Sequence, residues 1–245
     1  MRILVTNDDG VYATGLLPLV RKCMALGEVT VIVPYVEQSG KSHGIELKHP
    51  FRVRQVELAE DVTAIAIDST PADCVRYGVL ARKMEFDLVI SGINRGYNIG
   101  VDSLYSGTVA AVREASLLGI PAIALSTSVP YYDHAVDHVE EVFDYIRNNR
   151  LMELHKLYNI NIPPKPRGFR ITRQGGPYYS DDFVLTEDGM CTPNGVCVFE
   201  SSGDLTLDTD AVTSGYISIL PQTVDLTDWE AYRRLEGIGS GETNI

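Results

Sequence analysis

Two neighbouring carboxylates near the start of the chain are the feature most suggestive of chemistry. The run Asn7-Asp8-Asp9-Gly10 follows a short apolar run, residues 3–6. Carboxylates held a few ångströms apart raise each other's pKa, and a divalent cation relieves that repulsion. The alternative is an ordinary polar turn, because Asp-Gly is a common turn dipeptide. Asp8 and Asp9 are therefore the first candidates for metal binding and for catalysis.

Two later polar runs offer oxygen atoms of the same kind. Ser39 follows the apolar run 29–33, and Asn94 follows the apolar run 88–90. A hydroxyl, an amide oxygen and two carboxylates are hard ligands, which suit Mg²⁺, Mn²⁺ or Ca²⁺ and do not suit zinc or copper. We therefore predict one divalent metal ion, Mg²⁺ or Mn²⁺ with Ca²⁺ as a substitute in crystals. The predicted ligands are Asp8, Asp9, Ser39 and Asn94, and a set of turn and capping residues is the alternative.

Small residues precede a predicted helix over residues 108–118. The run Tyr105-Ser106-Gly107-Thr108 would present free backbone N–H groups and the positive end of the helix dipole, which bind phosphate. It is not a Walker loop, because no Gly-Lys-Ser/Thr closes it, and an ordinary Ser or Thr N-cap is the alternative. Beside a metal, the run predicts a phosphate cradle of Ser106, Gly107 and Thr108. His43 is a weaker candidate for a phosphate contact.

Strands and helices alternate along the first half of the chain. Strand-like runs cover residues 3–6, 29–33, 62–67, 88–90 and 122–125, and helix-like segments cover 16–26, 72–83 and 108–118. This alternation predicts an α/β fold with a Rossmann-like, doubly wound, mostly parallel sheet. Ligands bind such sheets at the carboxyl ends of the strands, where the candidate residues lie. The glycines of the 92–96 run are wrongly spaced for a nicotinamide cofactor.

The second half of the chain has a different character. Residues 134 to about 158 are predicted to be helical, and three prolines follow. Short strands at 169–172, 183–185, 196–199 and 216–220 predict an antiparallel β-hairpin appendage, with a polar loop over 204–213. A terminal helix begins at Thr227-Asp228-Trp229, before a frayed tail over 237–245. We therefore divide the chain into a Rossmann-like catalytic core, 1–130, and a second part, 131–245, with helix, appendage and oligomerisation segment.

Composition excludes several classes of protein. The formal net charge of −12 argues against a protein that binds duplex nucleic acid. The four cysteines lack the spacing of a zinc site. No apolar run approaches the roughly 18 residues that would span a membrane, and no signal peptide is expected from the first residues. A soluble cytoplasmic protein without a membrane partner is expected.

The end of the chain predicts self-association. Leu226, Trp229 and Tyr232 recur at a spacing of three and would form an apolar stripe that one chain could lend to another. Isolated hairpins also leave open edges that a second chain can pair with. At least a homodimer is therefore expected.

Several runs taken together resemble the SurE family, the stationary-phase survival protein nucleotidases. The likeness covers most of residues 1–127 and is looser towards the C-terminus. Ser69, before Thr70-Pro71, and Leu220, before Pro221, depart from the usual pattern. The runs that carry it are Asn7-Asp8-Asp9-Gly10, Gln38-Ser39-Gly40, Thr70-Pro71-Ala72-Asp73-Cys74-Val75, Ser91-Gly92-Ile93-Asn94-Arg95-Gly96-Tyr97-Asn98-Ile99-Gly100 and Tyr105-Ser106-Gly107-Thr108-Val109.

The resemblance implies a metal-dependent phosphomonoesterase that hydrolyses nucleoside 5′- and 3′-monophosphates. It places the divalent ion at the same four positions as the reasoning above, and it adds Asn98 to the phosphate-binding residues Ser106, Gly107 and Thr108. It also implies a homodimer or homotetramer formed by exchange of C-terminal elements.

Two questions stay open at the level of sequence. Either water activated by the metal attacks phosphorus, or Asp8 or Asp9 attacks it and forms an aspartyl-phosphate; the first is favoured because both aspartates serve as ligands. The alternative functions are a non-catalytic nucleotide-binding or sensor protein and a phosphatase for another monoester or polyphosphate.

Overall fold

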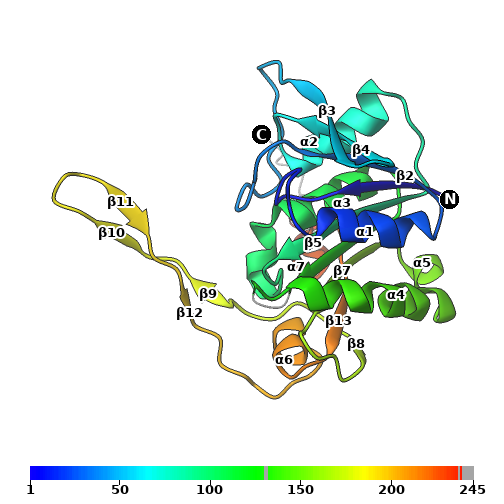
Figure 1. Ribbon diagram of the computed structural model, residues 1–245. Helices are drawn as coiled ribbons and strands as arrows, with labels where there is room; N and C mark the ends of the chain where they lie inside the picture. Colours follow the sequence, from blue (N-terminus) through cyan, green and yellow to red (C-terminus); the bar gives the residue numbers. More distant parts are fainter. Residues whose placement is uncertain (130–131, 237, 239–245) are drawn as a thin grey trace, which may run out of the picture.

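A nine-stranded, mostly parallel sheet forms the centre of the protein (Figure 1). The computed structural model describes residues 1–129, 132–236 and 238. The strands of this part of the chain are β1 Arg2–Thr6, β2 Glu28–Pro34, β3 Val53–Ala59, β4 Val62–Ile67, β5 Leu88–Arg95, β6 Ala122–Thr127, β7 Leu157–Ile162, β8 Phe169–Ile171, β9 Tyr179–Ser180, β10 Phe183–Leu185, β11 Cys191–Pro193, β12 Val196–Cys197 and β13 Ile217–Pro221.

The order of strands in the sheet explains the continuous apolar runs in the first half of the sequence. That order is β3-β4-β2-β1-β5-β6-β7-β13-β8. The β3–β4 and β7–β13 pairs are antiparallel, and the other neighbours are parallel. Central strands buried on both faces consist of continuous aliphatic runs. The carboxyl ends of β2, β1 and β5 meet at one edge of the sheet, because the three strands are parallel neighbours.

Helices cover both faces of the sheet (Figure 1). They are α1 Leu16–Met24, α2 Pro71–Arg76, α3 Gly107–Leu117, α4 Tyr132–Asn148, α5 Leu151–Leu154, α6 Asp208–Thr213 and α7 Trp229–Leu235, with a π-helical turn over Tyr77–Ala81 and a 3₁₀ helix over Gly100–Leu104. α1 packs beside α4 on one face, where Leu19 and Val139 join one buried apolar cluster. α2 packs beside α3 on the other, where Val75 and Val112 join a second cluster.

The fold class and the elements of the first half are confirmed. All five predicted strands and the three predicted helices are present, and β3 is an additional edge strand. Thr70 is the N-cap of α2: its Oγ1 accepts the N–H of Asp73 at 3.2 Å, and Pro71 takes the first helical position. The helix expected over 72–83 ends at Arg76 and continues as the π-helical turn.

Two strands assigned to the appendage belong to the main sheet instead. β13 pairs antiparallel with β7 and parallel with β8. The strands predicted at 169–172 and 216–220 are therefore present, but their assignment to the hairpin appendage is wrong. The sheet therefore continues well past residue 130. The division of the chain into two parts at that residue stays a prediction.

The predicted helix over residues 134–158 is too long. α4 ends at Asn148, and Arg150 adopts a left-handed conformation, with φ of 53°. β7 then begins at Leu157, because Tyr158, Ile160 and Ile162 are buried against the helical layer while the backbone pairs with β6 and β13.

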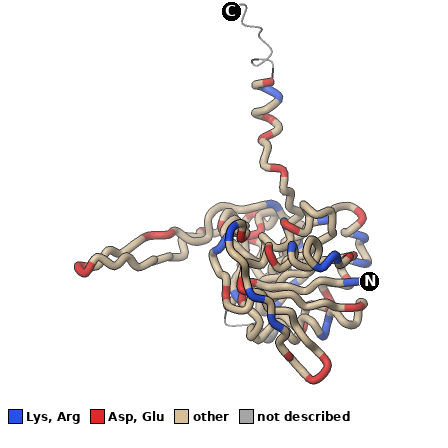
Figure 2. The backbone as a smooth tube through the Cα atoms, turned by 90° about the horizontal axis from the view of Figure 1, so that it is seen from above, with Lys and Arg blue, Asp and Glu red and all other residues tan. Residues whose placement is uncertain are grey.

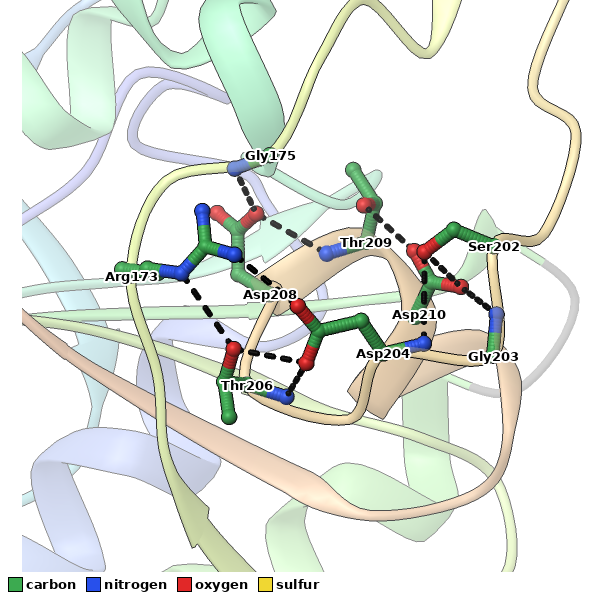
Figure 3. A network of polar contacts seen from close by, with 9 residues as sticks. All are labelled: Arg173, Gly175, Ser202, Gly203, Asp204, Thr206, Asp208, Thr209 and Asp210. Atoms are coloured by element: carbon green, nitrogen blue, oxygen red, sulfur yellow. Dashed lines mark hydrogen bonds and ion pairs between the residues drawn. The ribbon is translucent and has the colours of Figure 1, made fainter.

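The loop predicted over residues 204–213 is also wrong, because its second part forms α6. The aspartates that made this segment look like a loop are buried acceptors. Asp208 Oδ1 accepts the N–H of Gly175 at 2.7 Å, and Asp210 Oδ1 accepts the N–H of Gly203 at 2.8 Å (Figure 3). Their polarity satisfies backbone donors inside the protein instead of contacting solvent.

The remaining strands form a ribbon that projects from the body (Figure 2). β9 pairs with β12 and β10 with β11, both antiparallel, as expected for the hairpin appendage. The predicted terminal helix is present as α7, which Asp228 caps by accepting the N–H of Ala231 at 2.9 Å. The tail predicted over 237–245 lies outside the described residues, apart from Ile238. Among the helices described, none has the length and apolar character needed to cross a membrane.

Candidate functional site

Three chain segments converge on the turn that follows β1. The N–H of Gln38, after β2, donates to the carbonyl oxygen of Asp8 at 2.7 Å. The N–H of Arg95, at the end of β5, donates to Asp9 Oδ2 at 3.2 Å. The N–H of Thr108, in the first turn of α3, donates to Asp8 Oδ2 at 3.1 Å. The segments singled out from the sequence therefore meet around the two aspartates.

The residues on either side of the aspartates fix the shape of the turn. The Asn7 side chain donates to the carbonyl oxygen of Gly10 at 3.0 Å and accepts its N–H at 3.2 Å. Gly10 has a φ of +91°, and a Cβ there would lie 3.1 Å from the backbone nitrogen of Glu37. A glycine is thus needed both for the conformation and for the close approach of the next segment.

The aspartates lie in an environment that disfavours their negative charge. Asp8 is 3% exposed, and burial raises its pKa against the opposing effect of the Thr108 hydrogen bonds. Burial, and secondly the charge of Asp8, raise the pKa of Asp9 to about 6. The nearby carboxylate of Glu37 raises both pKa values further. A cation bound among these carboxylates would remove the repulsion.

The other two predicted ligands have hydrogen-bond partners of their own. Asn94 donates from Nδ2 to the carbonyl oxygen of Gly96 at 2.8 Å, so its amide oxygen is the end left to bind a cation. Ser39 is exposed and donates to Glu37 Oε1 at 2.7 Å. Within the described residues, no group of three or more His, Cys, Asp or Glu side chains is arranged to hold a metal. The predicted set relies on only two carboxylates, and its donors fit a hard divalent ion.

The predicted phosphate cradle is in contact with Asp8. Ser106 is the N-cap of α3, since its Oγ accepts the N–H of Val109 at 3.1 Å, as the alternative of an ordinary cap requires. The Thr108 hydroxyl donates to Asp8 Oδ1, and its N–H also goes to Asp8. A Cβ on Gly107 would lie 2.9 Å from the Cβ of Asp8. Thr108 thus supports the aspartate directly, and its role towards phosphate stays a prediction.

Asn98 is buried in a polar cluster with Ser126 of β6 and two asparagines of β7, which the sequence did not reveal. Its Nδ2 donates to Ser126 Oγ at 2.8 Å, and its N–H donates to Asn161 Oδ1 at 2.9 Å. Its carbonyl oxygen accepts from Asn159 and Asn161. The signal for this cluster was the pair of asparagines at alternate positions of an otherwise apolar strand.

His43 has a partner that explains it without a ligand. Its Nε2 lies 2.9 Å from Glu114 Oε2 on α3, and Arg76 donates to the other oxygen of Glu114 at 3.0 Å. These contacts, with that of His43 first, lower the pKa of the buried Glu114. The histidine therefore attaches the 41–50 segment to α3.

The chain is similar throughout to proteins of one family. The family model described as "Survival protein SurE" matches residues 3–181. Two relatives named 5′-nucleotidase SurE, from Thermosipho melanesiensis and Pelotomaculum thermopropionicum, are 38% and 41% identical to it. Each alignment covers 96% of this chain, with 96% of the first relative and 94% of the second. The crystal structure of the SurE protein from Aquifex aeolicus superposes with a TM-score of 0.79 at 30% identity, covering 98% of this chain and 100% of that one.

Proposed function

This chain belongs to the SurE family, and we propose that it is a nucleotidase that uses one divalent metal ion to hydrolyse nucleoside 5′- and 3′-monophosphates. The 5′-nucleotidase activity follows from its relatives, and the metal dependence and the 3′ activity are our proposal. One observation carries it: the segment after β2, the end of β5 and the start of α3 all bond to Asp8 or Asp9, of which Asp8 is buried.

In this proposal each group of residues has its own task. Asp8, Asp9, Ser39 and Asn94 hold Mg²⁺ or Mn²⁺, which supplies positive charge for the phosphate oxygens and lowers the pKa of water at the site. Asn98, Ser106 and Gly107 bind the phosphate at the start of α3, where the helix dipole favours an anion. Thr108 contributes by orienting Asp8 with both of its donors.

Release of inorganic phosphate tests the proposal directly. With Mn²⁺ present, we expect phosphate from AMP, GMP and 3′-AMP, and none after the metal is removed, because the carboxylates of Asp8 and Asp9 would then repel the substrate. A protein that binds AMP and releases no phosphate would instead be a nucleotide sensor. Faster hydrolysis of a sugar phosphate or a polyphosphate would point to a phosphatase of another class.

We also propose that the protein forms at least a homodimer in the reducing cytoplasm. Leu226 is 92% exposed, and Trp229 and Tyr232 are about half exposed on a helix without buried residues. Such an apolar stripe is typical of a segment that packs on another chain. The four cysteines are free thiols, as cytoplasmic cysteines usually are.

Light scattering at micromolar concentration tests the assembly. The intact chain is expected to have at least twice the monomer mass of 27.0 kDa. Truncation after Pro221 removes the apolar stripe, so the truncated chain is expected to associate more weakly and to approach the mass of its own monomer. Replacing exposed Leu104 by serine is a control that leaves the stripe intact. A monomeric intact chain would refute the proposal.

A further inference from the structure

Two asparagines interrupt the otherwise apolar sequence of β7, and Asn161 lies between Ser126 of β6 and Ser218 of β13. Asn159 and Asn161 are both completely buried, and they lie on one face of the strand because they are two residues apart. Burying an amide without hydrogen bonds is unfavourable by about 1–3 kcal/mol in proteins. Their presence in the middle of a sheet therefore needs a reason.

Every side-chain hydrogen bond that the structure describes for these two amides goes to the main chain of Asn98. Asn161 accepts the N–H of Asn98 at 2.9 Å and donates to its carbonyl oxygen at 3.0 Å. Asn159 donates to the same carbonyl oxygen at 2.7 Å. One peptide unit on each side of Asn98 is thus held by side chains of β7.

We call the side chains of Asn159 and Asn161 the asparagine clamp. The clamp holds the segment that connects the predicted metal ligand Asn94 with the predicted phosphate cradle. Asn94, a predicted metal ligand, precedes Asn98 by four residues, and the cradle at Ser106 follows it. A second buried group holds the same segment, since the N–H of Gly100 donates to Asp208 Oδ2 at 2.9 Å. The side chain of Asn98 donates from Nδ2 to Ser126 Oγ, so its orientation depends on that serine and on the contacts that hold its main chain.

We propose that Asn159 and Asn161 are positioning residues for phosphate binding: their amides fix the main chain of Asn98 so that its side chain meets the substrate. This inference rests on the proposed function, in which Asn98 contacts the phosphate. Neither amide contacts the predicted metal ligands through a described hydrogen bond. The clamp should therefore affect binding of the nucleotide and leave binding of the metal unchanged.

The test replaces Asn161 by leucine, which has similar volume and no polar atoms. We expect the KM for AMP to rise about tenfold, a change typical of losing a buried hydrogen-bonding partner. The affinity for Mn²⁺, measured by calorimetry without nucleotide, should not change. Hydrogen exchange of residues 98–104 should become faster. Asn159→Leu removes one hydrogen bond to Asn98 instead of two, so a smaller rise in KM is expected. This variant tests the inference if Asn161→Leu does not fold.

Ser218→Ala is the matched control. Ser218 lies opposite Asn161 on β13, is completely buried, and shares a 2.8 Å hydrogen bond with Thr172; the structure describes no hydrogen bond from it to Asn98. It should lower the melting temperature without changing the KM. An unchanged KM in both asparagine variants, or a KM that rises equally in the control, would overturn the inference. An inactive wild-type protein would instead overturn the proposed function, and faster exchange in Asn161→Leu would still reveal the clamp.

Discussion

Replacing Asp8 by asparagine should remove most of the phosphate-releasing activity and leave the fold intact. The amide has nearly the volume of the carboxylate, and its oxygen can still accept the N–H of Thr108. The charge that would hold the metal is lost, however. Loss of a partner outside the ligand shell costs about 10- to 100-fold in metal affinity or activity, so loss of a ligand should exceed this.

The metal-free Asp8→Asn protein should be at least as stable as the wild type at neutral pH. Burial raises the pKa of Asp8, so the folded protein binds the proton more tightly than the unfolded chain. Ionisation of this carboxylate therefore opposes folding above its unfolded pKa, and stability is lost as the pH rises. The asparagine removes that cost. A melting curve in metal-free buffer checks the sign.

Asp9→Asn and treatment with EDTA extend the same test. Both should abolish activity, and added Mn²⁺ should restore it only after EDTA. Asp61→Asn is a suitable control, because Asp61 is an exposed aspartate that pairs with Arg21 far from the turn after β1 in the sequence. Full activity of the wild type in metal-free buffer would contradict the proposed metal dependence.

The part of the fold that was predictable is the part whose pattern is local. β1, β4 and β6 are continuous aliphatic runs between turn signals, and such runs indicate buried parallel strands wherever they occur. β13 has an equally clear pattern, but nothing within residues 217–221 says that its partners are β7 and β8. Its place in the sheet depends on pairing between segments that are distant in the chain.

The errors share a second physical cause, which is the burial of polar groups. The aspartates of α6 are typical of a loop, and the two buried asparagines of β7 lie in a segment for which the sequence predicts no strand. In each case the polar side chain satisfies a main-chain donor or acceptor of another segment. Composition alone cannot distinguish such a residue from one in water.

That the three segments meet around Asp8 and Asp9 was predictable, and the contacts between them were not. The carboxyl ends of parallel strands pointed to Asp8, Asp9 and Asn94; Asn94 belongs to β5, which extends to Arg95 and so past the strand expected over 88–90, and the roles of all three as ligands stay predictions. The sequence did not show that Thr108 gives both donors to Asp8, or that a Cβ at Gly107 would collide with Asp8. These contacts change what a substitution at the start of α3 should do.

Gly107→Val should abolish activity and weaken metal binding as well. A Cβ at this position would lie 2.9 Å from the Cβ and 3.1 Å from Oδ2 of Asp8, and 3.1 Å from the Cγ of Pro71. Contacts this short force a neighbour to move, and Asp8 is held tightly by Thr108. Overpacking of this kind costs about 1–3 kcal/mol, and the displaced carboxylate is a predicted metal ligand. Calorimetry with Mn²⁺ and an assay with AMP measure the two effects separately.

Two further variants separate the clash from its alternatives. Thr108→Val keeps the N–H that Asp8 accepts and removes only the hydroxyl. Activity should therefore fall less than in Gly107→Val, by about the tenfold or less that the loss of one hydrogen bond causes. Gly176→Ala adds a Cβ where no atom lies within 4 Å and should change nothing. If Gly107→Val instead bound Mn²⁺ normally and lost only affinity for AMP, the glycine would serve the phosphate alone, and its contact with Asp8 would have no part in metal binding.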